Sequence, residues 1–192
     1  MCDARSPVNI LVEGLTDVPV VQRLLSATGL KCGRVFGQRG KSYLLAKYPN
    51  YNQAARYYPW LTLCDLDNDA DCAPQHLAES FQTAEQQMIL RIAVREVEAW
   101  LLADRKNLSK FLGISECRLP ANPDSLEDPK RELINAARHS RFRKIREDIV
   151  PVQGSGANVG RGYSSRITEF VSARHAAGWD IAVAAVQSDS LG

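Results

Sequence analysis

Acidic residues follow three apolar runs of the chain, at the positions where buried strands would end. Glu13 comes directly after the run 8–12, Asp65 after the run 60–64, and Glu96 shortly after the run 88–94. Short apolar runs bounded by turn residues are typical of buried strands. In an open parallel sheet, ligands bind beyond the carboxyl ends of the strands. The sequence therefore predicts carboxylates gathered at one edge of a parallel sheet.

Each of these acids is followed by a second acid at a spacing that directs both side chains into the same space. Asp17 stands one helical turn after the first acid, while Asp67 and Glu98 stand two residues after the second and third. Oxygen ligands alone favour Mg²⁺ or Mn²⁺ over zinc. Two such ions about 4 Å apart would hold the attacking and leaving oxygens of a phosphodiester.

The rest of the sequence predicts the elements that position these acids. Strands are expected over 8–12, 34–36, 60–64 and 88–94, and helices over 16–29, 75–87, 97–104 and 129–139, with a further helix capped by Ser165. This alternation favours an α/β fold with a parallel sheet covered by helices. We expect a core over 1–113 and a mainly helical and loop extension over 114–192, packed as one unit.

The near-neutral net charge of +2 conceals segments of opposite sign. Residues 18–64 contain seven basic residues and no acid, residues 65–90 six acids and no basic residue, and residues 130–146 seven basic residues and one acid. Nucleic-acid binding needs cations that follow the phosphates. The candidate nucleic-acid-binding residues are Arg39, Lys41, Arg141, Arg143 and Lys144.

Several other kinds of site are disfavoured by spacing. A calcium loop starting at Asp65 would need Gly and Glu where Ala70 and His76 stand. The five cysteines are scattered without a CxxC pair, which argues against a zinc knuckle and a disulfide framework and favours reduced thiols in the cytoplasm. The N-terminus lacks the apolar core of a signal peptide, and no apolar run approaches the roughly 20 residues of a membrane span.

The segments 12–17, 64–67 and 95–104 together resemble small stand-alone TOPRIM proteins close to the OLD (overcoming lysogenization defect) nucleases. The segments 128–133 and 160–164 resemble later motifs of the same uncharacterised group. The resemblance implies a TOPRIM-like Rossmannoid βα sandwich with a four-stranded, mostly parallel core sheet. It also implies Mg²⁺-dependent cutting of DNA or RNA. At the family level the resemblance implies an ABC-type ATPase as a partner and a role in phage defence or DNA repair. Whether the chain forms a homo-oligomer is left open.

The resemblance also assigns roles residue by residue. Glu13 would be a bridging metal ligand or the general acid/base. The implied metal ligands are Glu13, Asp17, Asp65, Asp67, Glu96 and Glu98. Lys130 would be the late lysine that stabilises charge in the transition state, although an ordinary lysine in the first turn of a helix fits its position equally well.

Two other functions compete with an endonuclease. One is a TOPRIM enzyme that processes structured RNA, similar to the 5S ribosomal RNA maturase, although Asn68 to Asp71 departs from that family's pattern. The other is a non-catalytic subunit that binds nucleic acid or a partner protein. The retained acids count against that second alternative.

Overall fold

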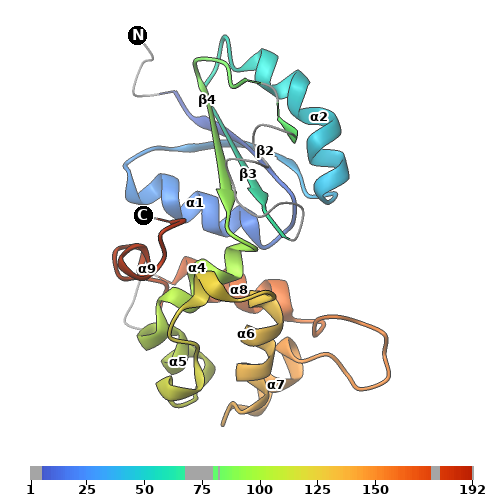
Figure 1. Cartoon of the computed structure of the whole chain (residues 1–192), viewed down its shortest axis with the longest axis vertical. Coiled ribbons are helices and arrows are strands. Elements are labelled where there is room, and N and C mark those ends of the chain that lie inside the picture. The colour runs from blue at the N-terminus through green and yellow to red at the C-terminus, as the bar shows by residue number, and fades with distance from the viewer. Residues whose placement is uncertain (1–5, 68–79, 82, 174–177, 192) are drawn as a thin grey trace. The chain divides into compact units, whose positions relative to one another are not determined.

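The computed structural model describes residues 6–67, 80–81, 83–173 and 178–191, and the chain divides into two compact units (Figure 1). The first unit is Met1–Val94 and the second is Arg95–Gly192. This division falls earlier than the boundary expected after residue 113. The reason is that α4 (Val97–Ala103) and α5 (Arg105–Leu112) pack with later helical segments of the second unit.

The first unit is built on a four-stranded parallel sheet, which confirms the α/β fold class. Its strands are β1 (Val8–Val12), β2 (Cys32–Gly37), β3 (Trp60–Asp65) and β4 (Met88–Ala93), in the order β2-β1-β3-β4. The chain leaves β1 towards one edge of the sheet and later returns to add β3 on its other side. The carboxyl ends of β1 and β3 therefore flank a topological switch point, which is where open α/β sheets bind ligands.

Helices cover both faces of this sheet. Because parallel crossovers are right-handed, the reversal of direction places α1 (Asp17–Ala27) and α2 (Lys41–Ala54) on opposite faces. Leu11 of β1 packs in one core cluster with Leu44 and Tyr48 of α2. Helix α2 is not predicted from the sequence, because Pro49 lies inside it and its apolar residues form no stripe along one face.

The polar helix expected over 75–87 does not continue to residue 87. Residues 75–79 and 82 lie outside the described residues, Ser80 is helical, and Phe81 and residues 83–87 are not helical. The buried side chain of Asn52 explains the extended course of this segment. Its amide donates to the Thr83 carbonyl at 2.9 Å and its oxygen accepts the Glu85 N–H at 2.9 Å, which satisfies backbone groups that a helix would otherwise pair.

The second unit is helical and is organised around α4, whose residues are all buried. Around it lie α5, the short 3₁₀ turns η1 (Glu116–Arg118) and η2 (Pro123–Ser125), α6 (Pro129–Arg138), α7 (Arg143–Ile149), α8 (Tyr163–Ser172) and α9 (Ile181–Gln187). The expected helix at 129–139 is therefore confirmed. The helix expected after Ser165 begins earlier, at Tyr163, so Ser165 lies inside it instead of capping it.

Hydrogen bonds tie the last helix to the centre of the second unit. The indole of Trp179 donates to the Trp100 carbonyl at 3.1 Å, and the indole of Trp100 donates to Ser190 Oγ at 2.7 Å. The buried carboxylate of Asp104 caps α5 and also accepts the Asp180 N–H at 2.8 Å. Trp100 is thus a core residue, as its apolar neighbours indicate.

Two glycines after β2 allow a direct prediction about the turn that leads into α2. Gly37 (φ +94°) and Gly40 (φ +83°) both have left-handed backbone, which costs other residues roughly 1–2 kcal/mol. A Cβ on Gly37 would lie 2.0 Å from the Val12 carbonyl oxygen, whereas a Cβ on Gly40 would meet nothing within 4 Å. In urea denaturation, Gly37→Ala should lower the free energy of unfolding by about 4 kcal/mol or more, and Gly40→Ala by only about 1–2 kcal/mol. Equal losses would contradict this close packing of β1 and β2.

Candidate functional site

The side chain of Glu13 links the ends of β1 and β3. Its Oε2 accepts the backbone N–H of Asp65 at 2.8 Å, and its own carbonyl accepts the N–H of Gly40, just before α2, at 3.0 Å. Glu13 therefore sits where the ends of two strands and the start of a helix meet. The two acids that the sequence placed after separate strands are brought together here.

Asp67 lies near enough to Glu13 to affect its pKa, and it is paired with a cation. Lys41 Nζ, from the first residue of α2, approaches Asp67 Oδ2 to 2.6 Å. Asp67 has left-handed backbone (φ +49°) and stands beyond the end of β3. A two-residue spacing directs two side chains to the same side only in extended backbone, so the prediction from spacing is wrong for Asp65 and Asp67. Lys41, which the sequence suggested for nucleic-acid binding, lies within the carboxylate site.

Asp17 is buried and holds the turn between β1 and α1. Its Oδ2 accepts the N–H of Gly14 at 2.8 Å, and Thr16 Oγ1 donates to Oδ1 at 3.4 Å. A carboxylate in the first turn of a helix also interacts favourably with the helix dipole. This geometry gives Asp17 a structural function, and its predicted function as a metal ligand stays a prediction.

Burial changes the acid–base behaviour of Glu13. Its pKa is raised from 4.5 to about 7. Desolvation is the largest cause and the nearby Asp67 and Asp17 add to it, while the Asp65 N–H and Lys41 oppose the rise. A carboxyl group with a pKa near 7 exchanges protons readily at neutral pH, which suits a general acid or base. Burial likewise raises the pKa of the Cys64 thiol, so this cysteine is an inert core residue.

A second carboxylate cluster lies in the second unit and contains Glu96, Glu98 and Lys130. Lys130 Nζ approaches Glu96 Oε1 to 2.6 Å and Glu98 Oε1 to 3.8 Å, while the Lys130 N–H donates to Glu96 Oε2 at 3.0 Å. Glu96 is the N-cap of α4 and Glu98 is in its first turn, so these two acids do not share an extended strand, in which a two-residue spacing would direct them to the same side. The cation beside both carboxylates is the ammonium group of Lys130.

Tyr163 completes this second cluster and was not singled out as a site residue from the sequence. Its hydroxyl donates to Glu98 Oε1 at 2.8 Å, across 65 residues of chain. Glu98 is fully buried, and its Oε2 has no hydrogen-bond partner in the described part of the chain. The pKa of Glu98 is raised to about 7, mainly by desolvation and also by Glu96, whereas Lys130 and Tyr163 oppose the rise. Tyr163 belongs to the segment 160–164, which resembles a later motif of the TOPRIM group. That resemblance is the signal that could have identified it.

The backbone around Tyr163 is set by two close approaches to Asp148. A Cβ on Gly160 would lie 2.3 Å from the Asp148 carbonyl oxygen, and a Cβ on Gly162 would lie 2.6 Å from Asp148 Cβ. The N–H of Gly162 donates to that carbonyl at 2.9 Å. Glycine is therefore required at these positions for α8 to start where its tyrosine can reach Glu98.

The predicted nucleic-acid-binding residues are divided between the two units. Arg39 lies over the ring of Tyr43, 5.3 Å from its centroid, in the first unit. In the second unit, Arg141 lies 4.9 Å from the ring centroid of Phe142, and Arg143 pairs with Glu147 at 2.7 Å. Lys144 is exposed. Each unit thus carries some of the predicted basic residues.

A ready-made metal site of three or more Asp, Glu, His or Cys side chains is absent from the residues that the structure describes. Asp69 and Asp71, which belong to the acidic segment, lie outside those residues. No helix in the described ranges combines the length and the apolar character needed to cross a bilayer.

Comparison with known proteins places the chain in a family without assigning an activity. The family model described as Domain of unknown function (DUF4276) matches residues 12–150. No curated protein and no solved structure matches the chain. The matched span contains Glu13, Asp65, Glu98 and Lys130, and it covers well over half of the sequence. The chain therefore belongs to the family of the domain of unknown function DUF4276.

Proposed function

We propose that this protein hydrolyses phosphodiester bonds in nucleic acid with Mg²⁺ or Mn²⁺, using water as the nucleophile. One observation carries the proposal. The carboxylate of Glu13 is bonded to the Asp65 N–H at 2.8 Å, across the junction between β1 and β3. This junction is the topological switch point of the sheet, and acids with raised pKa values at such positions are candidates for catalysis.

The donor atoms at this junction fit magnesium. Mg²⁺ is commonly held by one or two carboxylates, with water and substrate phosphate oxygens as its other ligands, and needs no dedicated protein cage. Asp65 would supply such a carboxylate, joined by Asp67 when Lys41 releases it, which leaves Glu13 to act as the base. When bound, the ion would lower the pKa of a water molecule and neutralise charge on the phosphate.

The chain's own groups would position and deprotonate the water. The Asp65 N–H holds one oxygen of Glu13 in place, so its other oxygen would accept the proton. Lys41 and the first turn of α2 offer an ammonium group and backbone N–H groups, the combination that binds phosphate at helix N-termini. Arg39, just before this turn, would bind a neighbouring phosphate.

The resemblance to TOPRIM proteins of the OLD nuclease group supports the same reaction. It rests on Glu13 with Asp17 four residues on, and on the pair Asp65 and Asp67, each in the expected relation to a strand. DNA and RNA are both retained as substrates. An ABC-type ATPase partner, a role in phage defence or DNA repair, and a location in the cytoplasm form part of this proposal.

A non-catalytic nucleic-acid-binding subunit is the second candidate, and one observation favours it. Lys41 neutralises Asp67 at 2.6 Å, which is the arrangement expected of a carboxylate that holds no metal. Titration calorimetry separates the two candidates. The catalytic proposal requires Mn²⁺ binding that is lost in Asp67→Asn, whereas the binding module gives no heat of Mn²⁺ binding.

The decisive test is a cleavage assay with the pure full-length chain. Supercoiled plasmid and a structured RNA are incubated with Mg²⁺, with Mn²⁺ or with EDTA. We expect cleavage of at least one substrate with metal, none with EDTA, and a loss of about 100-fold or more in Asp65→Asn. This variant keeps the backbone N–H that orients Glu13 and removes only the charge. Absence of cleavage under every condition, or full activity of Asp65→Asn, would refute the proposal.

A further inference from the structure

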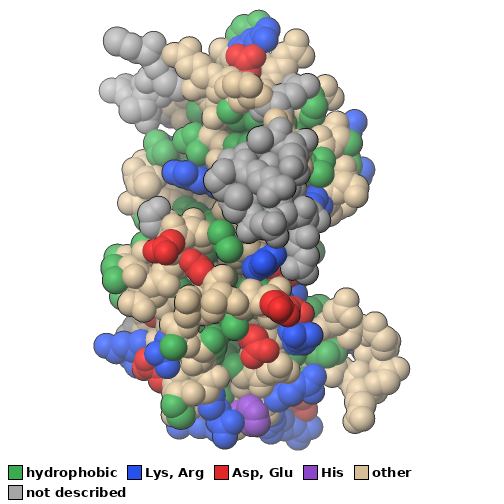
Figure 2. All heavy atoms as spheres, in the orientation of Figure 1, with side chains coloured by type: hydrophobic (Ala, Val, Ile, Leu, Met, Phe, Trp, Pro, Cys, Tyr) green, Lys and Arg blue, Asp and Glu red, His purple; other side chains and the backbone are tan. Residues whose placement is uncertain are grey.

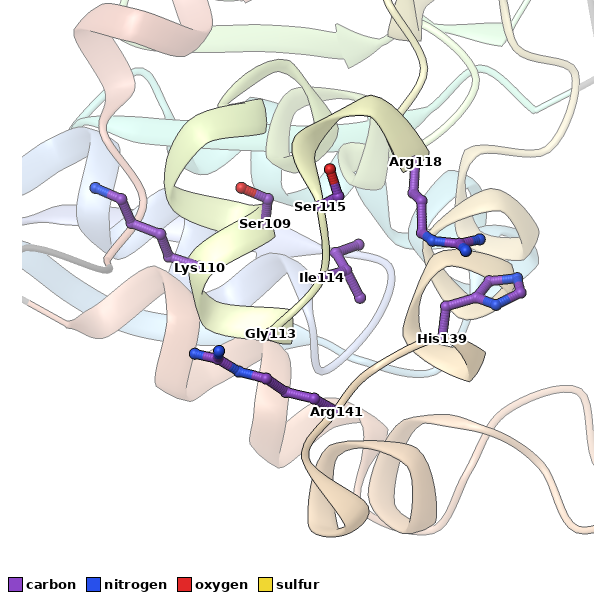
Figure 3. Close-up of a pocket in the computed structure, with 8 residues that line it drawn as sticks. All are labelled: Ser109, Lys110, Gly113, Ile114, Ser115, Arg118, His139 and Arg141. Carbon is purple, nitrogen blue, oxygen red and sulfur yellow. The ribbon is translucent and has the colours of Figure 1, made fainter.

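A basic pocket of about 460 Å³ opens on the surface of the second unit (Figure 3). It lies between the end of α5, the following turn, the 3₁₀ turn η1 and the segment after α6. Its lining residues are Ser109, Lys110, Gly113, Ile114, Ser115, Arg118, His139 and Arg141. In Figure 3, Arg118 and His139 lie on one side, Lys110 and Arg141 on the other, and Ile114 between them.

The charge of this pocket is of one sign. Lys110, Arg118 and Arg141 are cationic, and none of the eight lining residues is Asp or Glu. In the described part of the chain, no ion pair joins these three residues or His139 to an acid. Figure 2 shows the Lys and Arg side chains that crowd this surface over α5, α6 and α7. Like charges held together in this way repel one another unless an anion compensates them.

Helix termini account for only part of this arrangement. Lys110 is in the last turn of α5 and His139 directly follows α6, and cations stabilise the carbonyl ends of helices. Arg118 ends a three-residue 3₁₀ turn and Arg141 follows no helix directly, so neither has such a reason for its position. Helix termini therefore do not explain why these two guanidinium groups lie beside the pocket, although Arg141 also packs over the Phe142 ring.

The frame of the pocket is held by packed backbone and a buried hydroxyl. Gly113 has left-handed backbone (φ +66°), and a Cβ there would lie 2.5 Å from the ring of Phe142. The Arg141 N–H donates to the Gly113 carbonyl at 3.2 Å. The buried Ser140 hydroxyl donates to the Leu112 carbonyl and accepts the Phe142 N–H at 3.0 Å. The pocket is thus preformed around its cationic side chains.

We propose that this pocket binds the phosphate group of a nucleotide-sized phosphate monoester. A guanidinium group binds phosphate oxygens through two parallel N–H bonds, and Arg141 with Lys110, which lie on the same side of the pocket, would hold a dianionic phosphate. The volume exceeds that of a phosphate alone and falls within the range of small-molecule sites. Ile114 gives it an apolar floor, and the flat faces of Arg118 and His139 can stack on a base. This inference is independent of the proposed hydrolysis, since it uses none of the carboxylates.

The test is a binding titration of the full-length chain in EDTA, which removes any metal-dependent chemistry. Adenosine 5′-monophosphate, adenosine and inorganic phosphate are titrated by calorimetry at low salt. A 5′-phosphorylated hexanucleotide and its 5′-hydroxyl counterpart are titrated in parallel. We expect the monophosphate to bind at least 10-fold more tightly than adenosine or inorganic phosphate. The two oligonucleotides tell whether the phosphate belongs to a free nucleotide or to the end of a strand.

The matched variants are two double substitutions on the same surface. Arg118→Gln with Arg141→Gln should weaken binding of the monophosphate by about 10-fold or more. Lys106→Gln with Arg161→Gln removes the same charge from exposed positions outside the pocket and should change binding less than twofold. In amide spectra, the monophosphate should shift Gly113 and Ile114. Absence of binding, equal binding of inorganic phosphate, or equal losses in the two double variants would overturn the proposal.

Discussion

Glu13→Gln is expected to lower the rate constant of metal-dependent phosphodiester cleavage by about 100-fold or more while the protein stays folded. The carboxamide has the same shape as the carboxylate, and its oxygen can still accept the Asp65 N–H that Glu13 now binds at 2.8 Å. An amide accepts no proton from water, so the deprotonation step is lost. Single-turnover rates at saturating Mg²⁺ measure this step without a contribution from product release.

Glu85→Gln is the matched control in the same unit. Glu85 forms an exposed ion pair with Arg56 at 2.8 Å, a kind of pair that contributes about 1 kcal/mol or less. Its substitution should leave the cleavage rate within twofold of the unmodified protein. If Glu13→Gln cuts as fast as the control, Glu13 is not the proton acceptor.

The free energy of unfolding is expected to decrease as the pH rises from about 5 to about 8 in EDTA, and Glu98→Gln should remove much of this decrease. The folded protein raises the pKa of Glu98 from 4.5 to about 7. The folded state therefore binds this proton more tightly than the unfolded state does. The resulting stabilisation is complete below the ordinary pKa and is lost as the pH rises through about 7, with an upper value of roughly 3 kcal/mol.

The groups that face Glu98 supply the controls. Lys130 and Glu96 flank it, and Tyr163 donates a hydrogen bond to it that lowers its pKa. Tyr163→Phe should consequently move the pH dependence to higher pH. The pKa of Glu13 is raised in the same way. The free energy of unfolding of the double variant Glu13→Gln, Glu98→Gln should therefore depend less on pH than that of either single variant. Urea unfolding followed by circular dichroism between pH 5 and 8.5 measures these slopes, and an unchanged slope in Glu98→Gln would contradict the prediction.

Local sequence signals were sufficient to place the strands of the sheet. Runs such as 8–12 and 60–64 are apolar except for Asn9 and Thr62, as is typical of strands buried on both faces, and each run is followed by an acid. Helix α2 was not predicted because it contains Pro49 and because its buried residues, such as Tyr48, form no regular stripe. Tertiary packing against the sheet decides its conformation, and no local pattern reports that packing.

The acidic residues of the candidate site could be predicted from the sequence, but the lysines that pair with them could not. Glu13 and Asp65 follow adjacent strands, so the parallel sheet alone brings them together. Lys41 and Lys130 each pair with a carboxylate more than twenty residues away in the sequence. The spacing rules for helices and strands predict contacts only between residues a few positions apart. The same holds for Tyr163, whose contact with Glu98 depends on how α8 packs within the second unit.

The three tryptophans of the chain are distributed in a way that suits spectroscopy. Trp60 is buried in the first unit, at the start of β3, and Trp100 and Trp179 are buried in the second, where the indole of one donates to the carbonyl of the other. A variant that keeps only Trp60 would emit solely from the sheet, and a variant that lacks only Trp60 solely from the helices. Intrinsic fluorescence can therefore follow the melting of each unit separately in the intact chain, without an attached dye.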